Sequence, residues 1–385
     1  MAAEAAAGAP PRARPQWVET LLGQTLALLA AFLFAGVVGS VIIVSFAENP
    51  LEVYATIWDF STTSAANFAR VLADATPLIY SGLAVAVAFR AGLFNIGVEG
   101  QYIVGMMTAA TAAVTLDFLP GILHLTAVVT AAVIGSMAWA FVPAILKVKT
   151  GAHEVVTTIM MNGIAVALVG WALTGPLKTA EKGLIDLRTE RFAESARIPS
   201  IPDSLGLQDV PPSVYLTWLF PLALLACIGM WFLMYRMRLG YEVRAVGTSA
   251  GSAEAGGISI GATQVKIFLI SGFLAGFVGL NHLLAERGYL GGIYETGLGF
   301  AGIAVAFLGR NSPIGIPLAA ILLGMLSRGE DGIAVTTTLP REILIILEGL
   351  LILSVVIAYG VANRMLARRR QRVERAEEAA AGVRT

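Results

Sequence analysis

The sequence predicts an all-α integral membrane protein with about ten transmembrane or re-entrant helices. Its 385 residues are 57% hydrophobic and only 14% charged, and the mean hydropathy of +0.76 is far above that of a soluble globular chain. Apolar runs close to the ~20 residues that a spanning helix needs recur along most of the chain. Lysines and arginines gather at alternate ends of these runs, which fits the positive-inside rule.

Each apolar run is expected to form a helix. Three runs, at 76–89, 298–308 and 314–326, are short for full spans, so we expect tilted, broken or re-entrant helices there; one hairpin over 298–326 would leave the orientation of the remaining spans unchanged. The runs are Leu21–Phe46, Thr76–Phe89, Leu93–Leu116, Gly121–Leu146, Glu154–Thr174, Val214–Tyr235, Ile267–Ala285, Leu298–Leu308, Ile314–Leu326 and Ile343–Gly360.

Basic residues near the span ends place both termini in the cytoplasm. They precede the first run and follow the fourth, the sixth and the last. We therefore expect a cytoplasmic tail over 1–20, the first part of it disordered, a transmembrane domain over 21–361 and a second tail over 362–385. Within the domain, 175–213 is expected to be an extracytoplasmic loop and 236–266 a cytoplasmic loop. Arg287, Arg328 and Arg341 fall on the outer side against the rule, each near an acidic residue.

Several kinds of chemistry leave no pattern in this chain. The single cysteine, Cys227, excludes an internal disulfide and is expected to be a buried apolar residue. No Gly-x-x-x-x-Gly-Lys-Ser/Thr phosphate loop is present. Gly297–Gly302 matches Gly-x-Gly-x-x-Gly, but it lies in an apolar run without the strand that a dinucleotide site requires. The three histidines, His124, His153 and His282, have no metal-binding spacing, so we expect neither metal nor catalytic residues.

Polar groups inside the third apolar run are the most informative feature. The stretch 93–101 places Asn95, Glu99 and Gln101 among residues suited to lipid. A charged group at membrane depth costs roughly 2.5–3.5 kcal/mol on insertion scales, so it usually faces a bundle interior or a water-filled path. For Glu99 two interpretations stay open: a residue of such a path, or a buried partner of Arg90 or of a cluster of backbone groups.

The cytoplasmic loop at 236–266 is long compared with the other inner connections. Ala253-Glu254-Ala255, between Gly251 and the pair Gly256-Gly257, is expected to form one short helix bounded by glycines. Such a helix suits docking into a groove of a partner, although an ordinary surface helix would give the same pattern.

Four segments resemble the permease subunits of ABC importers, in the superfamily of ribose-type and branched-chain amino-acid permeases, and most of all the nucleoside importer permeases served by basic-membrane-protein lipoproteins. The resemblance covers roughly 20–360, and its most discriminating part is the stretch 93–101, where ribose-type permeases carry a Gly-Ile-Asp-Leu-Ser-like sequence. The segments are PLIYSGLAVAVAFRAGLFNIGVEGQYIVG (77–105), GAHEVVTTIMMNGIA (151–165), GYEVRAVGTSAGSAEAGGIS (240–259) and GLGFAGIAVAFLGRNSPIGI (297–316).

This resemblance implies an ABC permease bundle in a bacterial plasma membrane that moves nucleosides inward by alternating access. It also implies partners: an ABC ATPase that carries the ATP and Mg²⁺, a second permease that is a paralogue or a second copy, and an extracytoplasmic binding lipoprotein. The chain itself would be no enzyme and would bind no cofactor. The coupling helix seated on the ATPase would comprise Ser252, Ala253, Glu254, Ala255 and Gly256.

Candidates for the substrate path are polar or aromatic residues within the spans. A nucleoside offers hydroxyl groups and base edges for hydrogen bonding, and aromatic faces can stack on a base. For Thr158, Asn162 and Asn281 the alternative is hydrogen bonding between helices, worth about 0.6–2 kcal/mol each. The candidates are Phe94, Asn95, Glu99, Gln101, Thr158, Asn162, Asn281 and Phe300.

Other functions remain open from the sequence. The cargo of such a permease could be ribose, another simple sugar or a branched-chain amino acid. A secondary transporter driven by an ion gradient, with Glu99 as the coupling carboxylate, is an alternative of another class. A membrane enzyme would need a catalytic pair or a metal set, and a scaffold without transport would leave Glu99 unexplained.

Overall fold

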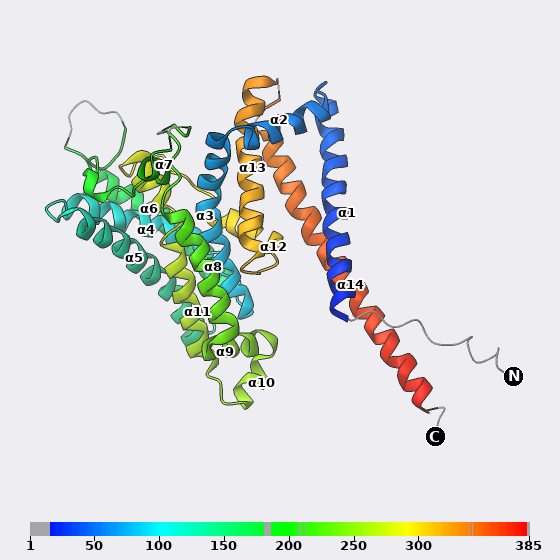
Figure 1. Cartoon of the computed structure of the whole chain (residues 1–385). Coiled ribbons are helices and arrows are strands. Elements are labelled where there is room, and N and C mark those ends of the chain that lie inside the picture. The colour runs from blue at the N-terminus through cyan, green and yellow to red at the C-terminus, as the bar shows by residue number, and fades with distance from the viewer. Residues whose placement is uncertain are drawn as a thin grey trace. The chain divides into compact units, whose positions relative to one another are not determined.

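The computed structural model describes residues 16–180, 186–207, 209–211, 213–337, 339–340 and 342–382, and almost all of the regular structure in them is helical (Figure 1). The predicted disorder over 1–15 lies outside these residues. The chain forms two compact units. Unit 1 comprises the described residues up to Val53 and from Thr337 onward, and unit 2 comprises those of Tyr54–Thr336.

Unit 1 is built on two long helices, α1 (Gln16–Ser45) and α14 (Glu342–Gly382), which pack along each other. Small residues make this packing close: Ala31, Ala35 and Gly39 are buried at a spacing of four, which places them on one face of α1. Leu33 and Val41, on other faces, stay 71% and 66% exposed, as expected for side chains in contact with lipid. The last apolar run ends at Gly360, but α14 continues to Gly382.

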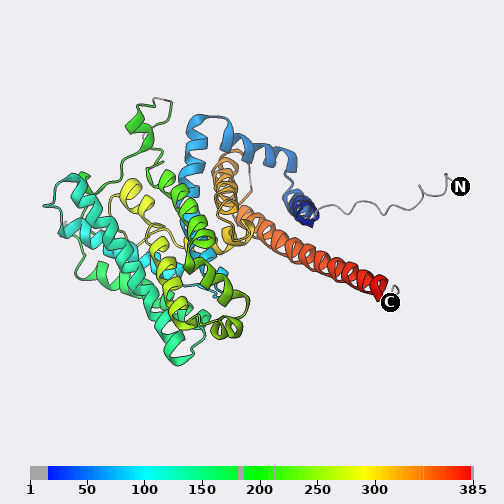
Figure 2. The same ribbon diagram turned by 60° about the horizontal axis from the view of Figure 1, so that its bottom comes forward.

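Unit 2 is a bundle around α3 (Ala65–Arg90), which contacts α8 (Leu219–Arg236), α11 (Ile260–Ala275), α12 (Leu298–Leu308) and α13 (Gly315–Thr336) (Figures 1 and 2). Around these lie α4 (Val98–Thr115), α5 (Gly121–Thr150) and α6 (Glu154–Thr174). An apolar window of α3 is 89% buried, whereas those of α5, α6 and α8 are 28%, 22% and 28% buried. The bundle therefore turns its most apolar surface outward, as a protein in lipid does.

Glycines set the closest contacts between these helices. Gly272 of α11 and Gly276, which directly follows that helix, face α5. A Cβ added to Gly272 would lie 2.7 Å from the Ala140 side chain, and one added to Gly276 would lie 2.7 Å from the Val133 Cα. The Gly-x-x-x-Gly pattern at 272–276 is therefore a helix-packing motif.

Several predicted boundaries need correction. The run at 76–89 is the second half of a full-length helix, since α3 begins at Ala65. A polar residue in the first half of α3 is paired: Arg328 donates to Asp74 at 2.6 Å. The run at 314–326 extends to Thr336, and the one at 267–285 splits into α11 and the π-helix η2 (Asn281–Arg287). A further helix, α2 (Pro50–Thr62), was not predicted. Among the described residues, five helices could each cross a membrane, or six with the bent pair Leu29–Ser45 and Pro50–Thr62 taken as one span.

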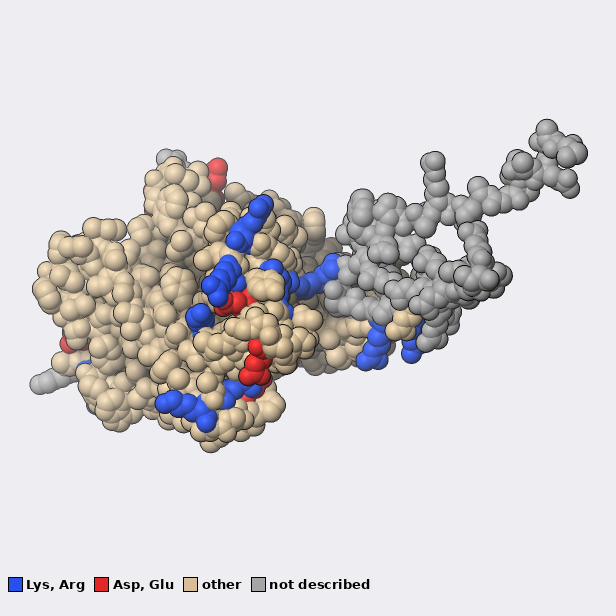
Figure 3. Space-filling view, turned by 90° about the horizontal axis from the view of Figure 1, so that it is seen from below, with Lys and Arg blue, Asp and Glu red and all other residues tan. Residues whose placement is uncertain are grey.

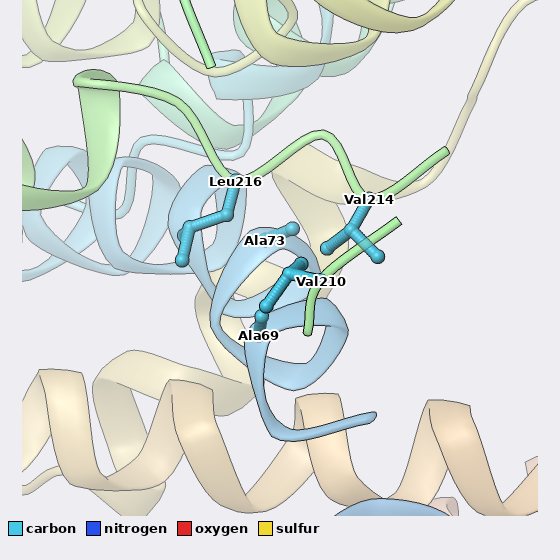
Figure 4. Close-up of a cluster of buried hydrophobic side chains, with 5 residues drawn as sticks. All are labelled: Ala69, Ala73, Val210, Val214 and Leu216. Atoms are coloured by element: carbon cyan, nitrogen blue, oxygen red, sulfur yellow. The ribbon is translucent and has the colours of Figure 1, made fainter. Parts of the chain in front are cut away.

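The loop predicted over 175–213 is folded against the bundle. It contains the 3₁₀-helix η1 (Glu194–Ala196) and the short helix α7 (Ile201–Leu205). Its Thr189 N–H donates to the Leu290 carbonyl at 2.9 Å, which joins it to the segment after η2. Figure 4 shows the hydrophobic cluster that fixes the end of this loop on α3: Ala69 and Ala73 with Val210, Val214 and Leu216.

The opposite end of unit 2 carries α9 (Arg238–Thr248) and α10 (Ala250–Ala255) (Figure 1). Seen from this end, Lys and Arg side chains gather on the surface with fewer acidic ones between them (Figure 3). Among them, Arg238 donates to Glu242 at 2.9 Å, and Lys266 lies 4.0 Å from the same carboxylate. The cytoplasmic position of the loop at 236–266 stays a prediction from the positive-inside rule.

Candidate functional site

Glu99 joins the first turns of two helices. It lies in the first turn of α4, which starts only at Val98 because residues 91–97 are not helical. Its Oε1 accepts from the N–H of Gly297 at 2.7 Å, and its Oε2 accepts from the N–H of Gly299 at 2.8 Å. These N–H groups belong to the start of α12, where no residue of that helix could accept them. The carboxylate is thus an N-terminal cap supplied from another helix, near two positive helix ends.

The glycines around this contact explain the Gly-x-Gly-x-x-Gly pattern. Gly297 has φ +93°, which favours glycine, and a Cβ on Gly299 would collide with the backbone N of Glu99. A Cβ on Gly302 would collide with the Ser81 hydroxyl of α3, which donates to the Leu298 carbonyl at 2.8 Å. The pattern therefore brings α12 against α3 and α4, and we call Glu99, Gly297 and Gly299, with Tyr102, the Glu99 cluster.

Tyr102 is a member that the sequence analysis missed. Its hydroxyl lies 3.1 Å from Glu99 Oε1 and 2.9 Å from the Glu295 carbonyl. Because Tyr102 is three residues after Glu99 on the same helix, the i, i+3 spacing was the available signal. Glu99 is 4% exposed, and two backbone N–H groups donate to its carboxylate, with the Tyr102 hydroxyl beside them. The sequence analysis offered Arg90 or a cluster of backbone groups as a buried partner of Glu99. The structure shows the backbone groups, since Arg90 donates instead to the Asn311 carbonyl.

Asn162 of α6 holds the start of α4 in a similar way. Its Oδ1 accepts from the Gly100 N–H at 2.9 Å, and its Nδ2 donates to the Ile96 carbonyl at 3.1 Å. Thr158, one turn earlier, donates to the Glu154 carbonyl of its own helix at 2.7 Å. A Cβ on Gly97 would lie 3.0 Å from the Thr158 Cβ. Both residues therefore support the irregular segment that precedes α4.

Asn95 and Gln101 form a buried amide pair. Gln101 Nε2 donates to Asn95 Oδ1 at 3.2 Å, and Asn95 Nδ2 donates to the Ser271 hydroxyl of α11 at 2.8 Å. Ser271 in turn donates to the Ala84 carbonyl of α3 at 2.7 Å. Asn95 is 2% exposed and Gln101 0%. This network links α3, α4 and α11. Both amide side chains therefore have hydrogen-bond partners within the protein.

The remaining candidates lie apart from these polar contacts. Asn281, at the start of η2, accepts from the Thr217 hydroxyl at 2.8 Å. Phe94 packs edge-on against Phe89 with ring centroids 4.9 Å apart. Phe300, one residue after Gly299, is 48% exposed. In this conformation the buried polar candidates are thus occupied by protein partners, while the aromatic candidates keep accessible surface.

The short helix predicted at 253–255 is present as α10. Ser249 begins it, because its side chain accepts from the Ser252 N–H at 3.3 Å. Ala253 is 4% exposed and packs inward, whereas Glu254 is exposed. Gly257 follows with φ +80°. Of the predicted coupling residues, Ser252–Ala255 lie in α10 and Gly256 ends it.

No group of three or more His, Cys, Asp and Glu residues within the described ranges could hold a metal ion. Cys227 is free and buried in α8, as expected for an apolar residue.

Comparisons with known proteins extend over nearly the whole chain. The chain is 35% identical to the guanosine ABC transporter permease NupP of Bacillus subtilis, over 88% of this chain and 95% of NupP. It is 30% identical to the glucose ABC transporter permease TsgB13 of Haloferax volcanii, over 89% of each chain. The nucleoside ABC transporter permease NupB of Lactococcus lactis is 28% identical over 87% of this chain and 92% of NupB.

The family match covers most of unit 2 and part of α14. Residues 67–356 match the family described as branched-chain amino acid transport system / permease component. This range includes the Glu99 cluster, the amide pair and α10, and the relatives are ABC transporter permeases. By its family match, its apolar helices and its relatives, this chain belongs to the permease component family of branched-chain amino acid transport systems.

Proposed function

We propose that this chain is the transmembrane permease subunit of an ATP-driven ABC importer that moves nucleosides inward by alternating access. The observation that carries the proposal is the 35% identity to a guanosine permease over 95% of that protein's length. The 28% identity to a second nucleoside permease supports the same cargo class. Because the chain has no phosphate loop, ATP and Mg²⁺ would bind to a separate ATPase subunit.

The proposal assigns a partner to each end of the bundle. The ATPase would receive α10, whose exposed Glu254 and buried Ala253 suit a short helix seated on another protein. An extracytoplasmic binding lipoprotein would deliver the nucleoside at the end that carries the loop 175–213. A second permease, preferably a paralogue, would complete the translocation pathway, with a second copy of this chain as the alternative.

The substrate path is proposed to follow α12 and the start of α4. Phe300 and Phe94 would stack on the base, since both rings keep accessible surface. Asn95, Gln101, Thr158, Asn162 and Asn281 would either contact the nucleoside after a conformational change or hold the helices that line the path. Glu99 would act chiefly through the Glu99 cluster, because each of its oxygens already accepts a hydrogen bond from a backbone N–H group.

Uptake by the complete transporter in cells tests the proposal. Cells that depend on this importer are given radiolabelled guanosine, with unlabelled nucleosides, glucose, ribose or leucine as competitors. We expect nucleosides to compete and uptake to stop when ATP is depleted with the proton gradient kept intact. Uptake that survives ATP depletion but collapses with the proton gradient would instead indicate an ion-coupled secondary transporter. Robust ATP hydrolysis by the purified permease alone would also contradict the proposal.

A simple sugar is the second candidate cargo. The 30% identity to a glucose permease over 89% of both chains favours it over a branched-chain amino acid. Titration of the binding lipoprotein separates the two: stabilisation against heat by purine nucleosides but not by glucose supports the first candidate. Stabilisation by glucose or ribose alone would establish the second.

A further inference from the structure

Arg90 connects three elements at the end of unit 2 that carries α9 and α10. It is the last residue of α3. Its Nε and Nη2 donate to the Asn311 carbonyl at 3.3 and 2.9 Å. Its guanidinium carbon also lies 5.9 Å from the ring centroid of Tyr235 in α8. The guanidinium carbon of Arg244 in α9 lies 5.6 Å from the same centroid. A forked donor of this kind fixes the orientation of the group that it binds.

The carbonyl that Arg90 binds belongs to a constrained turn. Arg310 and Asn311, between α12 and α13, have φ +59° and +50°, and neither is glycine. Residues in the left-handed region are disfavoured and persist where the surroundings hold them. The Arg310 N–H donates to the Phe307 carbonyl at 2.9 Å, and the Asn311 N–H to the Ala306 carbonyl at 2.7 Å. The turn is therefore rigidly attached to the last residues of α12.

The last turn of α9 packs directly on the backbone of Arg90. A Cβ on Gly247 would collide with the Arg90 carbonyl oxygen and would lie 3.2 Å from the carbonyl carbon of Ala91. Two residues later Ser249 begins α10. Because these contacts are between backbones, a displacement of α10 cannot be absorbed by side-chain rotation at this point.

Both ends of α12 are thus tied to the region of the chain around 90–99. Glu99 caps its first residues, and Arg90 holds the turn after its last residue. The helix has 11 residues, about 16 Å at 1.5 Å per residue, roughly half the hydrocarbon thickness. A short helix held at both ends moves as one body.

We infer that Arg90 is a positioning residue that transmits movement of α9 and α10 to the α12–α13 turn, and so moves α12 with the coupling helix. This inference rests on the proposed function, since it names the internal contact through which an ATPase would act on the path. Arg90 touches no substrate in this role. Its effect is on how much transport each ATP yields.

The ratio of ATP hydrolysed to nucleoside transported is the readout that tests the inference. The complete importer is reconstituted in proteoliposomes with wild-type chain, Arg90→Gln, Arg90→Lys or Arg328→Gln. Arg328→Gln is the matched control, because Arg328 also links α3 to α13, through Asp74, without touching the α12–α13 turn. Loss of charge-assisted hydrogen bonds predicts a ratio about tenfold higher for Arg90→Gln, a smaller rise for Arg90→Lys, and none for Arg328→Gln. An unchanged ratio for Arg90→Gln would overturn the inference.

A second measurement needs no change at Arg90. Spin labels are placed at Thr248, at the exposed end of α9, and at Ile314, which is 72% exposed just after the turn. We expect the distance between the labels to be the same in the ATP-free and ATP-bound importer, because both positions move together. A distance that changes in the otherwise wild-type importer would overturn the inference. Failure of the proposed function is distinguishable, since the wild-type importer itself would then show no ATP-driven uptake.

Discussion

Replacement of Glu99 by glutamine tests whether this residue stabilises the fold or binds substrate. The side chain keeps its size, but one acceptor oxygen becomes an NH₂ donor. At least one of the N–H groups of Gly297 and Gly299 then loses its acceptor. The site is buried, since Glu99 is only 4% exposed. A buried donor without a partner costs about 1–3 kcal/mol, and loss of a charge at helix N-termini costs up to about 2 kcal/mol. We therefore expect the free energy of unfolding to fall by about 1–5 kcal/mol.

Unfolding of the purified permease in mixed micelles, followed by tryptophan fluorescence as SDS increases, measures this change. Glu295→Gln is the control, because Glu295 is exposed and only its backbone carbonyl contacts the Glu99 cluster. It should alter the free energy of unfolding by no more than about 0.5 kcal/mol. The reasoning is refuted if Glu99→Gln unfolds like the control while nucleoside uptake is lost, since Glu99 would then act on the substrate and not on the helices.

Three further predictions concern helix packing, the start of α4 and the coupling helix. Gly302→Ala should cost about 1–3 kcal/mol of stability because its Cβ meets the Ser81 side chain. Gly163→Ala, with nothing within 4 Å, should instead stabilise α6 by about 0.5–1 kcal/mol in the same SDS titration. Asn162→Ala leaves the Gly100 N–H without its acceptor and should lower the free energy of unfolding by about 1–3 kcal/mol, with Asn162→Asp restoring part of it. Deletion of 253–255 should abolish uptake in cells at unchanged membrane expression, and uptake at a normal rate would contradict the role of α10.

Hydropathy predicted the bounds of two helices correctly, because in each of them the apolar run extends over the whole helix. α6 and α12 have the predicted bounds, Glu154–Thr174 and Leu298–Leu308. It failed where polar residues inside a helix are paired by distant residues. The run predicted at 76–89 begins only after Asp74, whose partner Arg328 lies 254 residues away. Such a pairing is a property of the assembled fold, so no local pattern could indicate it.

The same limit applies to the candidate site. The sequence alone indicated that Glu99 is exceptional, because a carboxylate among apolar residues is costly. It could not identify the partners, since the two N–H groups that Glu99 accepts from are about 200 residues along the chain. The path assignments of Phe94, Asn95, Gln101, Thr158, Asn162, Asn281 and Phe300 stay predictions, because the conformation shown satisfies the polar ones internally.

Glu99 and Arg90 illustrate how charged side chains in this bundle bind to backbone groups at helix ends. Glu99 accepts from the backbone at the start of α12, and Arg90 donates to the backbone after its end. The first N–H groups and the last carbonyl groups of every helix have no hydrogen-bond partner within that helix, and in a membrane they need one from elsewhere in the protein. A half-length helix therefore creates, at its two ends, the places where an acidic and a basic residue are stabilising. It follows that the acid belongs at the start of α12 and the base at its end, and that exchanging the two charges would destabilise both contacts.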